Sequence, residues 1–294
     1  MFSTDSLQEE EKVAKRMRRI YRAKNGVVEC TEFWAADSAQ PRRGKAKAST
    51  LRKQEQNRNQ AIHILARKLN DNFRQGDLLF TLTYDNAAFR ELRSRAYAGL
   101  AKGSRETKEI KRNAILFEAE KEGKLLIRRL RENGAKGCKY VLLGSDMDGG
   151  TGDEARVHLH LIFSGEAWEM QDRVLRFRQE DGGRRAMEEL WGRGAVDYEF
   201  MRSGSYNTLA AYLIRQTRDI PNHKRYVCSR NLDAVEFEEI ELGPNDEPIK
   251  APAGAKVEEY QHDPTNPYGM VYMRYVLPQQ AEKPKGKRRK GGAP

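Results

Sequence analysis

The stretch RVHLHLIFSG, residues 156–165, decides the fold prediction. Hydrophobic and other residues alternate along it, which is typical of a β-strand with one face toward a core. Because alternate side chains of a strand point to the same side, His158 and His160 are expected on one face. The opposite face is formed by Val157, Leu159, Leu161 and Phe163. The sequence therefore predicts a strand that buries an aliphatic face and presents two imidazoles on the other.

Two imidazoles at positions i and i+2 of a strand can bind one divalent metal ion. Such a site leaves coordination positions for a carboxylate, a water molecule and a phosphate oxygen. The alternative is a pair of polar residues on a half-exposed strand, and the spacing alone leaves both interpretations open.

Outward from this strand, the sequence predicts an α+β fold with a mostly antiparallel central sheet and flanking helices. Further strands are expected over residues 78–84, 138–145 and 195–201, and a last one at MVYMRYVL. Periodicity predicts helices over 6–24, from Thr50 to Gly76, over 108–133, in two pieces over 168–192, and over 205–218.

The strand at 78–84, LLFTLTY, places Phe80, Leu82 and Tyr84 on one face and Thr81 and Thr83 on the other. All three of Thr81, Thr83 and Tyr84 are candidate DNA contacts. Filling of the sheet is an equally good interpretation of these side chains.

Charge is distributed unevenly along the 294 residues, whose net charge is +11. Residues 1–75 carry +8, residues 233–282 carry −8, and residues 283–294 carry +6. Basic ends favour a polyanionic partner held by flanking segments, and a solvated surface with a disordered tail is the alternative. No apolar run is long enough for a membrane span, and the first residues lack the apolar region of a signal peptide. Three distant cysteines favour a reducing compartment.

The expected helix at 205–218 contains Tyr212, with Arg215 one turn later on the same face. A tyrosine can attack a phosphodiester when a metal ion withdraws charge from the phosphate and a cation supports the developing charge. Tyr206 is the other candidate on this helix, about 120° away around the axis. Each tyrosine could instead be a core or boundary aromatic.

FTLTY (80–84), HLH (158–160) and a tyrosine helix, in this order, resemble the motifs of rolling-circle replication initiators of the HUH endonuclease superfamily. The chain looks most like the branch with the filamentous-phage gene II-type domain. The phrases LWGRGAVDYEFM (190–201) and KRYVCSRNL (224–232) support this resemblance, which covers roughly residues 57–235.

The resemblance implies an HUH-like fold and a site-specific nick in single-stranded origin DNA of a plasmid or phage. Tyr212 would keep the 5′ phosphate as a phosphotyrosine, and a later attack by a 3′ hydroxyl would rejoin the strand. His158 and His160 would bind Mg²⁺ or Mn²⁺. The family also has an acidic ligand on the preceding strand, for which Asp146 is the first choice and Asp148 and Glu154 are the alternatives.

The family has lysine three residues after the tyrosine, where this chain has Arg215. Arginine keeps the charge but cannot act as a proton donor. Arg225 and Arg230, after the tyrosine helix, are further candidate phosphate contacts. Expected partners are single-stranded or origin DNA and host replication proteins, in the cytoplasm of a bacterial host and without a membrane.

Four segments are expected: a basic N-terminal helix and linker (1–56), the nicking domain (57–235), an acidic C-terminal extension (236–282) and a basic disordered tail (283–294). Two other functions stay open. One is a non-catalytic DNA-binding protein on the same fold, and the other is an unrelated metal-dependent hydrolase, for which a further pair of ligands would be needed. The sequence does not indicate the origin sequence, the oligomeric state or the metal used in the cell.

Overall fold

The computed structural model describes residues 15–35, 51–100, 107–148, 151, 153–164, 182–262 and 269–278. The expected tail at 283–294 and the first piece of the helix at 168–192 lie outside these residues. The fold is α+β, as predicted, and every strand pairing in it is antiparallel. The chain divides into a central unit (23–25 and 39–236) and a terminal unit (1–22, 26–38 and 237–294).

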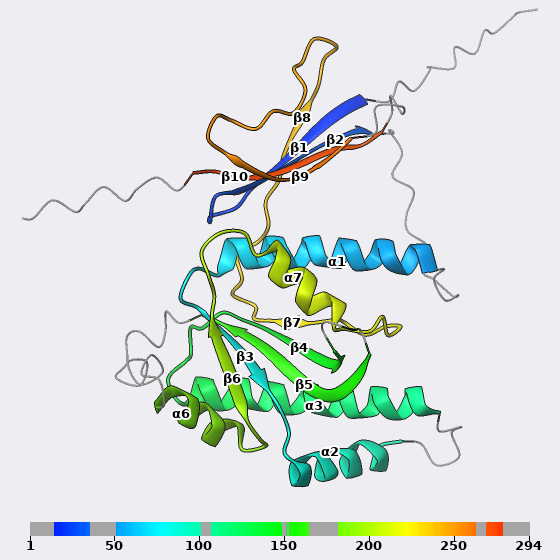
Figure 1. The fold of residues 1–294 in the computed structure, drawn as a ribbon, viewed down its shortest axis with the longest axis vertical. Helices are drawn as coiled ribbons and strands as arrows, with labels where there is room; N and C mark the ends of the chain where they lie inside the picture. The colour runs from blue at the N-terminus through cyan, green and yellow to red at the C-terminus, as the bar shows by residue number, and fades with distance from the viewer. Residues whose placement is uncertain are drawn as a thin grey trace, which may run out of the picture. The chain divides into compact units, whose positions relative to one another are not determined.

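The central unit contains a five-stranded sheet in the order β6-β3-β5-β4-β7 (Figure 1). Its strands are β3 (Leu78–Leu82), β4 (Tyr140–Met147), β5 (Glu154–Phe163), β6 (Val196–Phe200) and β7 (Val227–Cys228). Its helices are α1 (Leu51–Asn72), α2 (Asn86–Ala98), α3 (Lys108–Glu132), α6 (Gly182–Trp191) and α7 (Asn207–Arg215). The histidine strand β5 is therefore the middle strand of the sheet.

Helices cover both faces of this sheet, and each face has its own hydrophobic core. On the α3 face, Phe80, Leu126 and Leu159 are fully buried together. On the other face, α1 and α7 pack against Leu143 and Ile162 (Figure 1). The two cores follow from the alternation of β3, β4 and β5, because successive side chains enter opposite layers.

Two glycines are required where the backbone of the central unit approaches other atoms closely. A Cβ on Gly123 of α3 would lie 2.9 Å from methyl groups of Leu142 and Leu159, so the helix can lie this close to the sheet only without a side chain there. Gly194 has φ +157°, and a Cβ on it would lie 2.6 Å from the amide nitrogen of Asp85. The contacts of Gly194 explain why the sequence WGRG (191–194) ends with a glycine.

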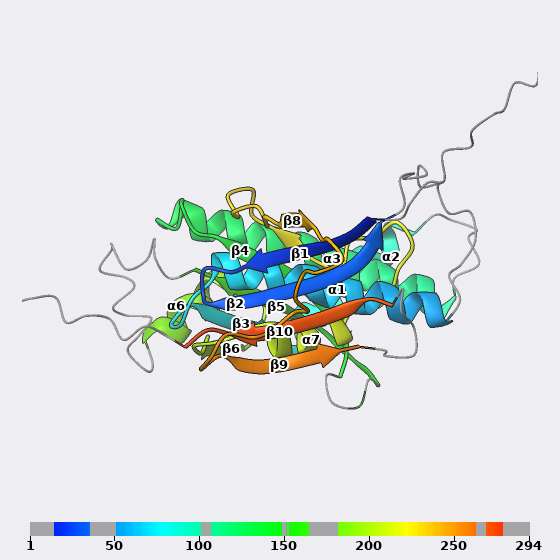
Figure 2. The same cartoon turned by 90° about the horizontal axis from the view of Figure 1, so that it is seen from above.

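The terminal unit is a second five-stranded sheet, in the order β8-β1-β2-β10-β9 (Figure 2). Its strands are β1 (Lys15–Arg22), β2 (Val27–Ala35), β8 (Glu238–Glu241), β9 (Lys256–Gln261) and β10 (Val271–Val276). One face has a core formed by Ile20, Val28, Cys30, Met273 and Tyr275. Segments from both ends of the chain thus form one sheet rather than two separate extensions.

The prediction of a helix over residues 6–24 is wrong for its described part, which is strand β1. Arginine, lysine and methionine favour a helix locally, but pairing with distant strands overrides that preference. Strand β1 pairs with β2 on one side and with the acidic strand β8 on the other.

The opposite charges of the two chain ends neutralise each other across this sheet. Lys15 lies 3.0 Å from Glu241, and Arg19 lies 2.6 Å from Glu239. Arg22 forms a further ion pair with Glu238. The N-terminal cations expected to favour a polyanionic partner thus form ion pairs with acidic side chains of β8.

No helix among the described residues combines the length and the apolar character that crossing a membrane requires.

Candidate active site

The candidate site lies on the α1/α7 face of the central sheet and is built around His158 and His160 of β5. Their ring centroids are 4.9 Å apart, with the planes nearly perpendicular. Across the ladder, Ser145 of β4 is opposite His158, and Thr81 of β3 is opposite His160. The predicted shared face is confirmed, since the intervening Leu159 is buried in the α3-side core.

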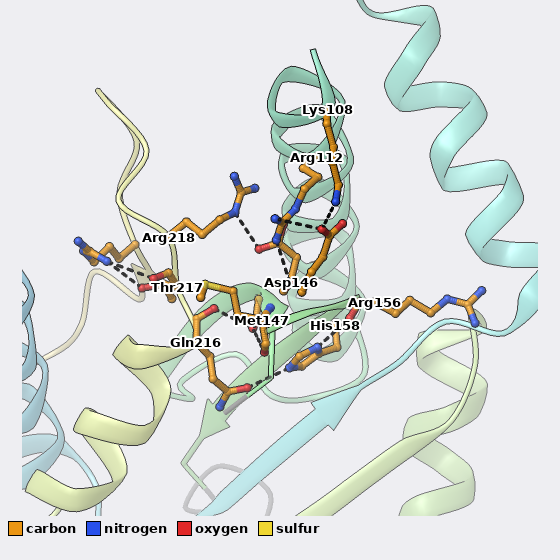
Figure 3. Close-up of polar contacts among 12 residues, drawn as sticks. Lys108, Arg112, Asp146, Met147, Arg156, His158, Gln216, Thr217 and Arg218 are labelled. Atoms are coloured by element: carbon orange, nitrogen blue, oxygen red, sulfur yellow. Dashed lines mark hydrogen bonds and ion pairs between the residues drawn. The ribbon is translucent and has the colours of Figure 1, made fainter. Parts of the chain in front are cut away.

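The hydrogen bond at Nδ1 leaves Nε2 of His158 with a free lone pair, and the contact at Nδ1 of His160 allows the same arrangement. His158 Nδ1 lies 3.0 Å from the backbone carbonyl of Arg156 (Figure 3). Because a carbonyl only accepts, Nδ1 carries the proton and Nε2 keeps its lone pair. His160 Nδ1 lies 3.3 Å from the hydroxyl of Thr81, which can accept in the same way. This arrangement, with Nδ1 bonded to the protein, is usual for histidines that bind a metal through Nε2.

Burial keeps His160 neutral. The side chain is only 2% exposed, and burial, together with electrostatic repulsion from the neighbouring His158, lowers the pKa of His160 to about 4. A hydrogen bond with Gln216 opposes this shift in part. A neutral imidazole is the form that binds metal ions, so His160 is in this form at neutral pH.

The amide of Gln216 lies between the two imidazoles. Its Oε1 is 3.2 Å from His158 Nε2 and 3.3 Å from His160 Nε2 (Figure 3 shows the first contact). In the tautomer with both protons on Nδ1, three atoms with free lone pairs face one another. Among the described residues, the amide Nε2 is buried without a hydrogen-bond partner. A divalent cation between them would satisfy all three acceptors, whereas a half-turn of the amide would let its NH₂ group donate to the rings instead.

Imidazole nitrogens are common ligands of divalent transition metals, and an amide oxygen is a ligand that also suits Mg²⁺ and Mn²⁺. The residues present therefore fit a divalent cation. In the described part of the chain, no group of three His, Cys, Asp or Glu side chains could hold a metal ion. The third side chain beside the two imidazoles is thus an amide rather than the expected carboxylate.

Tyr212 of α7 is close to this cluster, as the order of motifs predicts. Its ring centroid is 6.0 Å from that of His160, and the side chain is 45% exposed. Tyr212 and Gln216 are four residues apart, so one face of the helix brings both toward the histidines. Arg215 is exposed at the last position of α7.

Tyr206 does not reach the cluster. It is 5% exposed in the core between α1, α7 and the sheet, and burial raises its pKa to about 12. Its backbone is the N-terminal cap of α7, without a capping side chain. The described geometry therefore leaves Tyr212 as the exposed tyrosine beside the imidazoles.

Asp146, the first choice for the acidic ligand, does not point at the imidazoles. It is 6% exposed, and both carboxylate oxygens are engaged: Oδ2 lies 2.9 Å from Arg112 Nε, and Oδ1 lies 2.9 Å from Arg218 Nε (Figure 3). The irregular pairing between Ser145 and Met147 coincides with this position. Ser145 is thus the β4 residue opposite His158, and Asp146 pairs with arginines.

The two alternatives to Asp146 are also engaged elsewhere. Glu154 forms an ion pair with Lys108 at 2.6 Å and lies 3.5 Å from Arg112. Asp148 accepts hydrogen bonds from the backbone and hydroxyl of Thr151 in the loop before β5.

Of the candidate DNA contacts, only Thr81 lies within the cluster. Thr83 donates its hydroxyl to the carbonyl of Ala195 at 3.0 Å. Tyr84 is 4% exposed and packs edge-on against Trp191 in the α3-side core, so this position does not suit a DNA contact.

The two arginines expected near phosphates differ in their surroundings. Arg225 donates to the carbonyl and the hydroxyl of Thr217 and forms an ion pair with Asp219 at 3.1 Å, so its role in the described structure is internal. Arg230 is exposed and lines a surface pocket that also contains Tyr140.

Sequence reasoning missed Gln216, although its position four residues after Tyr212 was a usable signal. The expectation of a carboxylate as the third metal ligand pointed to Asp146 of β4 instead. Comparison of the chain with protein-family models, with curated proteins and with solved structures gives no match.

Proposed function

We propose that the central unit is a divalent-metal-dependent enzyme that nicks and rejoins single-stranded DNA through a phosphotyrosine on Tyr212. The observation that carries this proposal is the convergence of an exposed tyrosine with two imidazole Nε2 atoms and an amide oxygen. The motif order adds the suggestion of a rolling-circle initiator of the HUH type, acting on plasmid or phage origin DNA in a bacterial cytoplasm with host replication proteins.

His158, His160 and Gln216 would hold Mg²⁺ or Mn²⁺ in this proposal. A divalent cation supplies charge withdrawal from a phosphate oxygen when it is bound. The protein's own contribution is to orient both rings. The Arg156 carbonyl and the Thr81 hydroxyl do this through the Nδ1 atoms.

Tyr212 would supply the nucleophile. Its phenolic oxygen loses its proton to solvent and forms a bond to phosphorus while the bond from phosphorus to the 3′ oxygen breaks, and the leaving oxygen takes up a proton from solvent. Religation reverses these bond changes, so the phosphotyrosine conserves the bond energy and no ATP is needed. Arg215 can support charge on the phosphate oxygens but cannot supply the proton.

The test uses single-stranded oligonucleotides of randomised sequence with a label at the 3′ end, incubated with Mn²⁺. A 5′ phosphotyrosine keeps the labelled downstream fragment on the protein, so a labelled band should survive denaturing electrophoresis. We expect Tyr212→Phe to abolish this adduct and Tyr206→Phe, the buried control on the same helix, to retain it. An adduct at full yield with Tyr212→Phe would refute the assignment of the nucleophile.

The metal site is tested without catalysis, by titrating the protein with Mn²⁺ and measuring free Mn²⁺ by electron paramagnetic resonance. Gln216→Ala should weaken binding by about tenfold or more. Gln216→Glu should keep or increase the affinity because it places a carboxylate oxygen at the same point. Equal Mn²⁺ affinity of the wild type and Gln216→Ala would show that the amide is not a metal ligand.

A non-catalytic DNA-binding protein is the second candidate function. It is favoured by Asp146, the expected acidic ligand, being paired with two arginines instead of pointing at the histidines. Binding of single-stranded DNA that EDTA does not change, without an adduct under any divalent metal, would support this function over the first.

A further inference from the structure

The segment that follows α7 is fixed to strand β4. Helix α7 ends at Arg215, and the hydroxyl of Ser145 donates to the backbone carbonyl of Gln216 at 2.9 Å. Two residues later, Arg218 reaches Asp146, the neighbour of Ser145, at 2.9 Å (Figure 3). Adjacent residues of β4 thus fix both the start and the end of the segment 216–218.

The ion pair at the end of this segment is well shielded from solvent. The side chains of Asp146 and Arg218 are 8% and 16% exposed, respectively. Shielded charges interact more strongly than charges at the surface, and removal of one partner leaves the other charge in a poorly solvated place. Arg112 of α3 binds the other carboxylate oxygen, so Asp146 also links the segment to α3.

The amide of Gln216 has few constraints of its own. Its Oε1 faces the two imidazoles, and its Nε2 is buried without a hydrogen-bond partner. No side chain that the structure describes therefore forms a hydrogen bond to the amide from the side opposite the imidazoles. Its direction depends on the backbone of the segment, which Ser145 and Asp146 hold.

We infer that Asp146 is a positioning residue, which acts through its ion pair with Arg218 to keep the Gln216 amide between His158 and His160. This inference rests on the proposed function in one respect, namely that the amide oxygen serves as a metal ligand. Asp146 thereby influences metal affinity without touching the metal.

Direct binding of the metal ion by Asp146 would predict the opposite effect of removing Arg218. If Asp146 were a ligand after a rearrangement, loss of Arg218 would free its carboxylate and leave metal affinity equal or higher. If Asp146 acts through Arg218, loss of either partner should weaken binding to a similar extent. The double variant should then be no worse than the single variants, because the same interaction is lost.

The experiment measures Mn²⁺ binding and the side-chain amide signal of Gln216 in the full-length protein. The proteins are the wild type, Asp146→Asn, Arg218→Gln and the double variant, with folding checked by circular dichroism. The amide signal is recorded by ¹H–¹⁵N NMR without metal and is assigned by its absence in Gln216→Ala. The matched control is Lys108→Gln, which removes a cation of the same network that pairs with Glu154 and not with Asp146.

We expect both single variants to weaken Mn²⁺ binding by about tenfold, the range seen for residues that orient metal ligands. The amide signal should move in both, and the control should match the wild type. Wild-type behaviour of Arg218→Gln in both measurements would overturn the inference, as would a loss confined to Asp146→Asn. If the wild type binds no Mn²⁺, the proposed metal site fails, and the amide signal alone decides whether Asp146 positions Gln216.

Discussion

The two five-stranded sheets of this protein use polar side chains in opposite ways. In the terminal unit, cations of β1 lie opposite carboxylates of β8, so that donors and acceptors neutralise each other across the ladder. In the central unit, three groups that can each act as an acceptor converge, namely the Gln216 amide oxygen and Nε2 of His158 and of His160. A sheet whose polar groups are mutually satisfied has little capacity left for a ligand, whereas converging acceptors are incomplete without one.

The two sheets also differ in how deeply their polar side chains are buried. The central sheet is buried on both faces by helices, and burial of His160 lowers its pKa. In the terminal unit, several β1 and β8 charges remain half-exposed, where ion pairs contribute little. The comparison teaches that burial, rather than the number of charged residues, sets the chemical character of each sheet.

The largest expected effect is on the core that supports the histidines. Leu159 lies between His158 and His160 in the sequence, and its fully buried side chain points to the opposite face of the strand. Leu159→Ala should lower the free energy of unfolding by about 4 kcal/mol. The matched change in the terminal sheet, Met273→Ala, should cost about 2 kcal/mol, since Met273 keeps some exposure. Urea denaturation followed by circular dichroism measures both, and equal losses would contradict the difference between the two cores.

A second effect comes from the depressed pKa of His160 in the metal-free protein. The folded pKa of about 4 lies below the ordinary value of 6.5, so between these values the unfolded chain binds a proton that the folded chain does not. Stability should therefore fall as pH decreases through this window, by about 2 kcal/mol from pH 7 to pH 5.

The measurement is urea denaturation at both pH values in the presence of a chelator, for the wild type and for His160→Gln. The variant should lack this part of the pH dependence. If the wild type and His160→Gln show the same loss of stability between pH 7 and pH 5, His160 is not held neutral by burial.

The smallest effects test charge pairing in the terminal sheet. Glu32 is 3% exposed and lies 2.6 Å from Arg18, so Glu32→Gln should cost about 1.5 kcal/mol and respond weakly to salt. Glu239→Gln breaks a half-exposed pair with Arg19 and should cost less than about 0.5 kcal/mol, a loss that salt reduces further. Denaturation at low and high salt checks both, and a larger cost for Glu239→Gln would invert the expected role of burial.

Local patterns in the sequence were sufficient for much of the central unit. The alternation along 156–165 correctly placed two histidines on one face and Leu159 on the other. The order of motifs also led us to expect Tyr212 near these histidines, and its ring centroid lies 6.0 Å from that of His160. These features depend on the geometry of a single strand or helix, which is why a sequence pattern can reveal them.

Features that depend on distant segments could not be predicted in this way. Strand β1 has a composition that favours a helix, and one of the two strands with which it pairs, β8, is far away in the chain. The ligand role proposed for Gln216 depends on where α7 ends and on its contact with Ser145. The arginines that form ion pairs with Asp146 come from α3 and from the segment after α7, so only the folded structure reveals these pairs.

The sheet made from both ends of the chain has a consequence for biosynthesis. Arg19 and Glu239 are 220 residues apart, so a ribosome that adds about 5 to 20 residues per second makes β8 some 10 to 40 seconds after β1. During that interval the central unit can fold, while β1 and β2 wait with open edges. Open edges invite aggregation, and charged side chains discourage it. The cations of β1, which are neutralised in the finished sheet, are therefore expected to act first as protection for the nascent chain.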